Sequence, residues 1–264
     1  MSASLSDLPL RTLYRPRDTI GPHAAAWALE GGADQPVILH SLFGGGTVTE
    51  PGAPTLWFGV PADGALSSLL SVLPEADRLH IRRLRSEKDR WSVAAARAAL
   101  RILLSQRLDC SAQDIFLIRD ERGKPSLDPQ RHGAMAGELH ISISHARELV
   151  AVAIGRSRIG IDVEAVRGFP DLMDVADMQF AREMRDDLRT VETDRERVAL
   201  FFRFWTLGEA FIKATGEGIA QGLQSFAFSA HGRPALTRVD EPWGPCDRWS
   251  FGTLGWGEAP KGLR

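Results

Sequence analysis

Apolar and polar residues follow two different periods along this chain. From Leu73 to Leu108 apolar side chains recur at helical spacing, which predicts a long amphipathic helix that ends near Leu108. From Glu138 to Val166 the pattern changes to three short β-rich runs, LHISIS, LVAVAI and RIGIDVE, separated by polar turns. Because these runs follow one another closely, we expect three adjacent strands in one sheet.

The rest of the chain alternates between predicted helices and strands. PTLWFGV predicts a strand at residues 54–60, and QSFAFSA and DRWSFGTL predict two more. The apolar segment ERVALFFRFWTLGEAFIKATGEG predicts a helix that ends at Gly216 or Gly218. Strands, a helix, and then strands and helices again predict an α+β protein with two comparable halves that divide near Gly155.

The predicted domain organisation has three parts. Residues 1–53 contain small and glycine-rich pieces with weak periodicity, so we expect a loosely structured N-terminal extension there. Residues 54–155 would form the first half of the folded body, and residues 156–264 the second.

Composition narrows the class of protein. Hydrophobic residues make up 44% and charged residues 25%, as in average soluble proteins, and no apolar run is long enough to span a membrane. The first residues lack the basic start and apolar segment of a secretory leader. A net charge of −2 argues against nucleic-acid binding. We therefore expect a cytoplasmic monomer without nucleic-acid or membrane partners.

An acidic pair lies in the run GIDVE, residues 160–164. Apolar and acidic residues alternate there, so on a strand Asp162 and Glu164 lie on one face. Two neighbouring carboxylates repel each other unless a cation lies against them, and Mg²⁺ takes such oxygen ligands together with substrate phosphates. The pair predicts a metal site, and the alternative is a solvated face at the edge of a sheet.

A glutamate and a lysine stand one helical turn apart in WTLGEAFIK. Glu209 and Lys213 share a helix face with Trp205, and large apolar residues surround them. For the motif alone, an ordinary ion pair between residues i and i+4 remains an open alternative. Since the apolar neighbours must be covered, we expect this polar stripe to face the acidic pair, which it would supply with a third carboxylate and a cation.

Two further segments carry candidate phosphate ligands. Ser144 and His145 end the run ISISH, and serine hydroxyls, backbone N–H groups and histidine can all hydrogen-bond phosphate oxygens. Lys124 stands in a predicted turn between Gly123 and Pro125. Each signal is weak alone, because a histidine in a turn is commonly structural and many loops contain GKP.

Taken in order, PEADRLHIRRL, GKP, ISISH, GIDVE and WTLGEAFIK resemble the 4'-phosphopantetheinyl transferases of the type that serves peptide and polyketide synthases. The specific part is the pairing of G-[IV]-D-[VI]-E with a downstream W-x-x-K-E-x-x-x-K, preceded by the serine-histidine element. The resemblance runs from about Leu73 to Phe228. It implies two similar α/β halves related by a pseudo-twofold axis, with coenzyme A and Mg²⁺ bound in the cleft between them.

The resemblance also implies roles for individual residues. Asp162, Glu164 and Glu209 would hold Mg²⁺ against the coenzyme A pyrophosphate. Glu209 is also the candidate base for the carrier serine, and Lys213 would neutralise charge that develops during transfer. The coenzyme A phosphates would be bound by three residues, Lys124, Ser144 and His145.

Two positions depart from the family pattern. Gly208 stands where the family has a lysine beside the glutamate, which removes a charge and costs roughly 1 kcal/mol of helix stability relative to alanine. Ser92 stands where many relatives have an arginine that contacts a coenzyme A phosphate. We expect one of three neighbours to take over that contact, Arg82, Arg83 or Arg90.

The implied activity is transfer of 4'-phosphopantetheine from coenzyme A to a serine of an apo acyl or peptidyl carrier protein, with Mg²⁺ and with release of 3',5'-ADP. Two alternatives remain open. A catalytically weakened coenzyme A-binding protein would account for the changes at Gly208 and Ser92. An unrelated Mg²⁺-dependent phosphohydrolase would use the same carboxylates.

Overall fold

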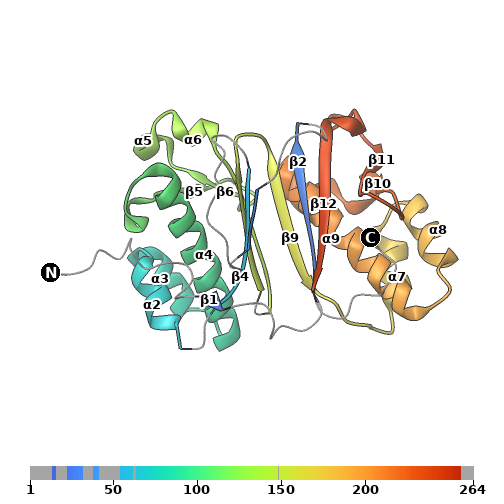
Figure 1. Cartoon of the computed structure of the whole chain (residues 1–264), viewed down its shortest axis with the longest axis horizontal. Coiled ribbons are helices and arrows are strands. Elements are labelled where there is room, and N and C mark those ends of the chain that lie inside the picture. The colour runs from blue at the N-terminus through green and yellow to red at the C-terminus, as the bar shows by residue number, and fades with distance from the viewer. Residues whose placement is uncertain are drawn as a thin grey trace. The chain divides into compact units, whose positions relative to one another are not determined.

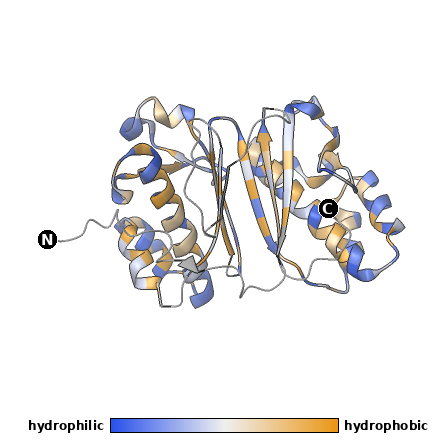
Figure 2. Ribbon diagram, viewed as in Figure 1, coloured by the Kyte–Doolittle hydropathy of each residue, from blue (hydrophilic) through white to orange (hydrophobic). Residues whose placement is uncertain are grey.

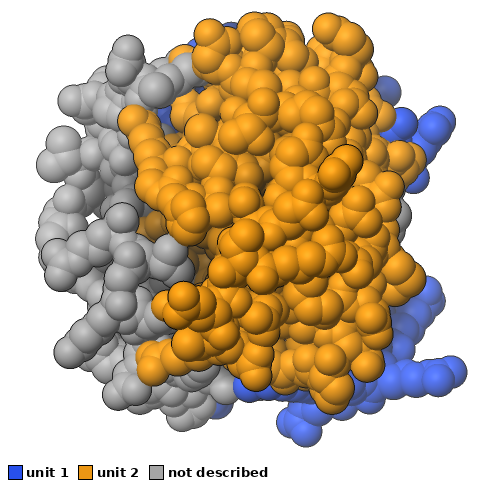
Figure 3. Space-filling model, turned by 90° about the vertical axis from the view of Figure 1, so that its right-hand side faces the viewer, with its two compact units in different colours: residues 1–19, 37–156 blue, residues 20–36, 157–264 orange. Residues whose placement is uncertain are grey.

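The computed structural model describes residues 14–15, 23–31, 38–41, 54–61, 64–147 and 149–256 (Figure 1). Two compact units make up the chain, and each mixes helices with a sheet. The first unit takes its described residues from 1–19 and 37–156, and the second from 20–36 and 157–264 (Figure 3). The predicted α+β class is thus confirmed, and the chain passes between units one residue after the predicted division at Gly155.

The first unit is built on a five-stranded sheet in the order β1-β4-β8-β7, with β3 also paired to β4. The β3–β4 pairing is parallel and all the others are antiparallel. The bounds are β1 (Tyr14–Arg15), β3 (Ile38–Ser41), β4 (Thr55–Pro61), β7 (His140–Ala146) and β8 (Leu149–Gly155). The strands predicted at 54–60 and in the first two β-rich runs are therefore confirmed.

Helices pack against this sheet, and the longest is α4 (Glu87–Leu108). Ser86 caps its first turn by accepting a hydrogen bond from the Asp89 N–H, and the end at Leu108 is the predicted one. Buried alanines along α4 let it pack closely, and Figure 2 shows hydrophobic residues along it. The segment before it forms shorter helices instead of extending α4, namely α2 (Leu66–Val72) and α3 (Glu75–Arg82).

The remaining part of the first unit is a small hairpin with short helices. It carries the GKP turn between its two strands. Its elements are η3 (Ala112–Asp114), β5 (Leu117–Arg119), β6 (Pro125–Leu127), α5 (Pro129–His132) and α6 (Met135–Glu138).

The second unit has a three-stranded antiparallel sheet in the order β12-β2-β9. Its strands are β2 (His23–Glu30), β9 (Ile159–Ala165) and β12 (Trp249–Trp256). Two predictions are wrong here. Residues 23–30 are the central strand of this sheet and not part of a loose extension, and β9 pairs with β2 instead of joining the sheet of β7 and β8. The rest of the predicted extension up to residue 53 lies largely outside the described residues.

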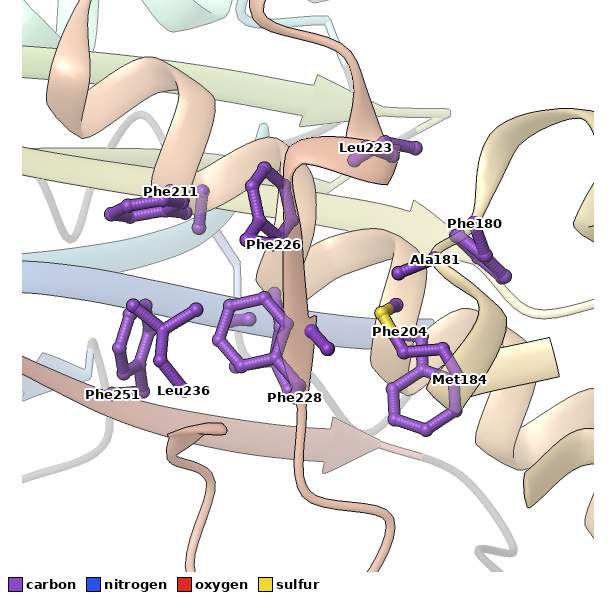
Figure 4. Close-up of a cluster of buried hydrophobic side chains, with 14 of the residues drawn as sticks. Phe180, Ala181, Met184, Phe204, Phe211, Leu223, Phe226, Phe228, Leu236 and Phe251 are labelled. Atoms are coloured by element: carbon purple, nitrogen blue, oxygen red, sulfur yellow. The ribbon is translucent and has the colours of Figure 1, made fainter. Parts of the chain in front are cut away.

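Helix α9 (Asp194–Thr215) covers one face of this sheet. The Thr193 hydroxyl caps its start by accepting a hydrogen bond from the Glu196 N–H, and it also donates to the Glu196 carboxylate. Gly216 ends the helix with a left-handed φ of 83°, as predicted. Figure 4 shows the core on this side, where the Phe211 ring packs edge-on against Phe226 at 5.0 Å between ring centroids. Burial of such aromatic rings stabilises this unit beyond what helix propensity alone would supply.

Other elements of the second unit complete this core. The predicted strand in QSFAFSA is confirmed as β10. The elements are α7 (Leu172–Gln179), α8 (Arg182–Thr190), η4 (Gly218–Gln221), η5 (Leu223–Ser225), β10 (Phe226–Phe228), β11 (Leu236–Val239) and η6 (Cys246–Arg248). Within the described ranges, every helix is too short or too polar to cross a bilayer.

Candidate functional site

Small residues on the sheet of the second unit let α9 come close. Directly paired residues of antiparallel strands share a face, so Ala28 lies beside Gly160, and Ala26 beside Asp162. A Cβ on Gly160 would lie 1.9 Å from the backbone oxygen of Ala210 in α9. Helix backbone and strand backbone are therefore in contact, and this contact brings the acidic strand within reach of side chains on α9.

The closest polar contact at this point joins Asp162 to Lys213. Lys213 Nζ lies 2.7 Å from Asp162 Oδ1. The Asp162 side chain is 5% exposed and the Lys213 side chain 31%, so the pair spans from the helix–sheet interface outward. A pair this buried is costly to break, because the remaining charge would be left without its counter-charge. This contact agrees with the prediction that the polar stripe of the helix faces the acidic pair.

Glu164 lies two residues further along the same face of β9 and is half-buried. Burial, followed by the negative charge of Asp162, raises the pKa of Glu164 to about 7. Lys213 and the Trp205 side chain lower the pKa of Glu164 in the opposite direction. Glu164 thus sits in a place that disfavours its ionised form unless a further cation is present.

Glu209 on α9 is the third carboxylate of the cluster. Burial, and then the charge of Asp162, raise its pKa, while Lys213 lowers it. The carboxyl of Glu209 also raises the pKa of Glu164. All three predicted acidic residues therefore interact electrostatically, although they come from a strand and a helix more than forty residues apart in sequence.

The cluster is not a preassembled metal centre. Within the part of the chain that is described, no three acidic, histidine or cysteine side chains stand together as a ligand set. The chemistry of the donors nonetheless suits a hard divalent cation, since carboxylate oxygens are the preferred ligands of Mg²⁺ and their mutual repulsion would be relieved by it. Asp162, Glu164 and Glu209 are the residues that could hold such an ion, with Lys213 as the cation already among them.

The predicted phosphate ligands lie in the first unit. Ser144 is buried on β7, and His145 follows it as an exposed residue. Lys124 stands in the turn between β5 and β6, where its backbone N–H donates to Asp120 Oδ1 at 2.8 Å. Gly123 enters this turn with a φ of 85°, a conformation that glycine adopts without strain. The turn therefore holds Lys124 at a fixed place on the surface of the first unit.

The three candidate arginines are engaged to different extents. Arg90 donates to the Leu84 carbonyl at 3.0 Å and so helps to hold the connection between α3 and α4. Arg82 lies 3.9 Å from Glu75 on the exposed side of α3. Arg83 follows α3 directly and is exposed. Exposed Arg82 and Arg83 are better placed than Arg90 to contact an anionic ligand, because a weak surface ion pair costs little to break.

Close packing in the core explains why position 208 is a glycine. A Cβ at this position would lie 2.4 Å from Leu223 Cδ2 and 3.3 Å from Phe226 Cε2, both in the hydrophobic core. Position 208 therefore turns toward the core and not toward Asp162 and Lys213. The lysine charge that the family pattern has at position 208 is therefore missing from the apolar side of α9.

Ser92 also has a structural role. Its hydroxyl donates to the Arg147 carbonyl at 2.8 Å and is buried. Arg147 lies in the turn after His145 with a left-handed φ of 52°. Ser92 thus ties α4 to the turn that follows the serine-histidine element, a link that the sequence did not suggest.

Comparisons with known proteins agree with this architecture. Residues 57–156 match the model of the N-terminal domain of 4'-phosphopantetheinyl transferases, and residues 158–258 match the model of the 4'-phosphopantetheinyl transferase superfamily. The boundary between the two matches falls where the chain passes from the first unit to the second. Two separate observations therefore divide the chain at the same place.

Individual relatives point to the same class of enzyme. The chain is 30% identical over 173 residues to a putative 4'-phosphopantetheinyl transferase of Synechocystis sp., covering 64% of this chain and 68% of that protein. It is 32% identical over 170 residues to the 4'-phosphopantetheinyl transferase HetI of Nostoc sp., covering 63% and 70%. The chain is 26% identical over 179 residues to the 4'-phosphopantetheinyl transferase Sfp of Bacillus subtilis, and the match covers 66% of this chain and 76% of that protein.

The fold, the carboxylate cluster and these relatives define a transferase of phosphopantetheinyl groups. The chain belongs to the 4'-phosphopantetheinyl transferase superfamily.

Proposed function

We propose that this enzyme transfers 4'-phosphopantetheine from coenzyme A to a serine of an apo acyl or peptidyl carrier protein, with the help of Mg²⁺. The observation that carries the proposal is the cluster of three interacting carboxylates with Lys213 on Asp162. A partly buried cluster of like charges destabilises a fold, so its presence is best explained by a ligand that neutralises it.

Each residue of the cluster has a definite task in this proposal. Asp162, Glu164 and Glu209 hold Mg²⁺, which when bound neutralises charge on the pyrophosphate of coenzyme A. Lys213 leaves part of its contact with Asp162 and offers its ammonium group to the phosphoryl oxygens, where negative charge develops.

Glu209 accepts the proton of the carrier serine, directly or through a water molecule. Its raised pKa suits this task, because a base works best when its pKa approaches the working pH. The serine oxygen then bonds to the β-phosphorus, and the bond from that phosphorus to the bridging oxygen breaks. The carrier keeps phosphopantetheine, and 3',5'-ADP leaves with the electron pair of that bond.

The first unit would supply the coenzyme A phosphate contacts. Lys124 provides a cation held by its turn, and Ser144 and His145 provide hydrogen-bond donors at the end of β7. Exposed Arg82 and Arg83 are further candidates, whereas Arg90 is occupied by a backbone carbonyl. Since Ser92 is buried, it contributes through the turn at Arg147 and not through a phosphate contact.

Mass spectrometry of the carrier protein tests the proposal. Purified enzyme is incubated with coenzyme A, Mg²⁺ and an apo carrier, and the carrier mass should increase by one phosphopantetheine group. Asp162→Ala and Glu209→Ala should each lose this transfer, while Glu192→Gln, an exposed control, should keep it. Near-normal turnover by either alanine variant at limiting Mg²⁺ would show that the metal assignment is wrong.

Two companion assays, of coenzyme A binding and of phosphate release, separate the alternatives. Coenzyme A binding without any change in carrier mass would indicate a catalytically weakened binding protein. Steady release of phosphate from simple phosphate esters without a carrier would indicate a phosphohydrolase. The expectations of a monomer and of a cytoplasmic location stay predictions, which size-exclusion chromatography and cell fractionation test.

A further inference from the structure

The turn that carries Lys124 is closed by backbone hydrogen bonds on both sides of its tip. Strands β5 and β6 pair as far as Arg119 and Pro125. Beyond them the Gly123 N–H donates to the Asp120 carbonyl at 2.9 Å, and the Asp120 N–H donates to the Lys124 carbonyl at 3.2 Å. With Gly123 in a left-handed conformation, these bonds make a three-residue loop of the kind that closes tight hairpins.

The side chain of Asp120 braces this loop further. Its Oδ1 accepts the Arg122 N–H at 3.0 Å and the Lys124 N–H at 2.8 Å. Hydrogen bonds to an ionised acceptor are stronger than bonds between neutral groups. One carboxylate oxygen therefore fixes two peptide groups of the loop, and one of them is the peptide group of Lys124 itself.

Neighbouring residues restrain Lys124 from both sides. Arg119 Nη1 donates to the Gly123 carbonyl at 2.7 Å. Pro125 follows Lys124, is buried, and favours an extended backbone at the residue before it. The first atoms of the Lys124 side chain thus have a defined place and direction. Among the described residues, the exposed Glu121 side chain takes part in none of these hydrogen bonds.

A restrained backbone lowers the entropic cost of binding at this residue. The lysine ammonium is a point charge on a long flexible stem, so the place of the backbone decides which ligand oxygens it can reach. When the backbone of one residue is ordered before binding, the dissociation constant is lower by about 5- to 30-fold than when binding must order it.

We propose that Asp120 is a positioning residue that presents Lys124 to a phosphate of coenzyme A. This inference rests on the proposed function, because it takes Lys124 as a phosphate ligand. Asp120 does not bind the phosphate itself, since two anions repel each other. Charge alone therefore predicts that removal of the Asp120 carboxylate strengthens coenzyme A binding, whereas the positioning role predicts that it weakens binding.

Calorimetry with coenzyme A and Mg²⁺, without a carrier protein, distinguishes these two predictions. Asp120→Ala should raise the dissociation constant about 5- to 30-fold. Asp120→Asn keeps an acceptor oxygen and should stay within about threefold of the wild type. Glu121→Ala is the matched control, because it removes one carboxylate from the same loop, and it should not weaken binding. Unchanged or tighter binding by Asp120→Ala would overturn the proposal.

A double-mutant cycle shows whether Asp120 acts through Lys124. Lys124→Met removes the ammonium group, and in that background Asp120→Ala should change the dissociation constant by less than about twofold. An equal loss of affinity in both backgrounds would indicate a merely structural role and would overturn the proposal. Lys124→Met with the affinity of the wild type would overturn it as well.

Amide hydrogen exchange gives a readout that needs neither ligand nor activity. The Lys124 N–H should exchange about tenfold faster or more in Asp120→Ala than in the wild type, and at the wild-type rate in Glu121→Ala. Equal exchange in Asp120→Ala and the wild type would refute the brace itself. A carrier protein whose mass does not change would instead refute the proposed function, while binding and exchange would still decide the role of Asp120.

Discussion

Replacing Glu164 by glutamine should stabilise the metal-free protein at alkaline pH. Glutamine has nearly the same shape as glutamate and carries no charge. The pKa of Glu164 is raised from 4.5 to about 7 in the fold, so the folded protein holds this proton more tightly than the unfolded chain does. The stabilisation that results is complete below about pH 4.5 and is lost as the pH rises through about 7.

The magnitude follows from that change in pKa. Each unit of change in pKa corresponds to about 1.4 kcal/mol of stability. Because the side chain is partly exposed, solvent screening reduces this free energy. We expect ionised Glu164 to cost the wild-type fold about 1 to 2 kcal/mol at pH 8. The Glu164→Gln protein should then have a Tm about 3 to 8 °C higher at pH 8, and about half of this advantage or less should remain at pH 5.

Thermal unfolding followed by circular dichroism in EDTA measures this difference. Glu192→Gln removes an exposed carboxylate between α8 and α9 and should change Tm little at either pH. Addition of Mg²⁺ should raise the Tm of the wild type more than that of Glu164→Gln, because a ligand stabilises the state that binds it. If Glu164→Gln is no more stable than wild type at pH 8, or if its advantage does not depend on pH, the account of Glu164 is refuted.

Two further predictions concern glycines. Gly160→Ala should lower the free energy of unfolding in urea by about 3 kcal/mol or more, because its Cβ would overlap the backbone of α9. Gly168→Ala is the control and should be tolerated, since the nearest atom to its Cβ would be 3.9 Å away. Gly208→Lys should destabilise the second unit by about 1 to 3 kcal/mol, because the new side chain would overpack against Leu223. The double variant with Leu223→Ala should recover part of that loss. Full stability of the Gly208→Lys protein would contradict the packing account.

The sequence predicted α9 well because its signals are local. The dense apolar run and the glycine at its end, Gly216, both act within the helix itself. The same holds for the acidic strand β9, whose alternation placed Asp162 and Glu164 on one face. A side-chain arrangement that depends on spacing within one element could thus be predicted in advance.

Strand β2 was missed because its signal is tertiary. HAAAWALE is rich in alanine, which has low β propensity, and its neighbours are glycine-rich. Its alanines are useful because α9 must approach the sheet, a requirement that appears only once Gly160 and Ala210 are in contact. The pairing of β9 with β2, and not with β8, is likewise a long-range contact that no local pattern indicates.

Long-range contacts also explain the two positions that departed from the family pattern. Nothing near Ser92 in sequence indicates its hydrogen bond to Arg147, fifty-five residues away. The core neighbours of Gly208, Leu223 and Phe226, likewise lie outside the motif in which Gly208 stands. Local spacing identified the candidate residues, and packing between distant segments determined what they contact.

Binding of a divalent cation tests the central claim most directly. With Mn²⁺ as a paramagnetic probe, titration of the wild type in the presence of coenzyme A should give one bound ion per chain, which Mg²⁺ displaces. Asp162→Asn, matched in shape and checked for an intact fold, should bind none at the same concentrations. An unchanged Mn²⁺ stoichiometry in Asp162→Asn would contradict the claim that these carboxylates hold the ion.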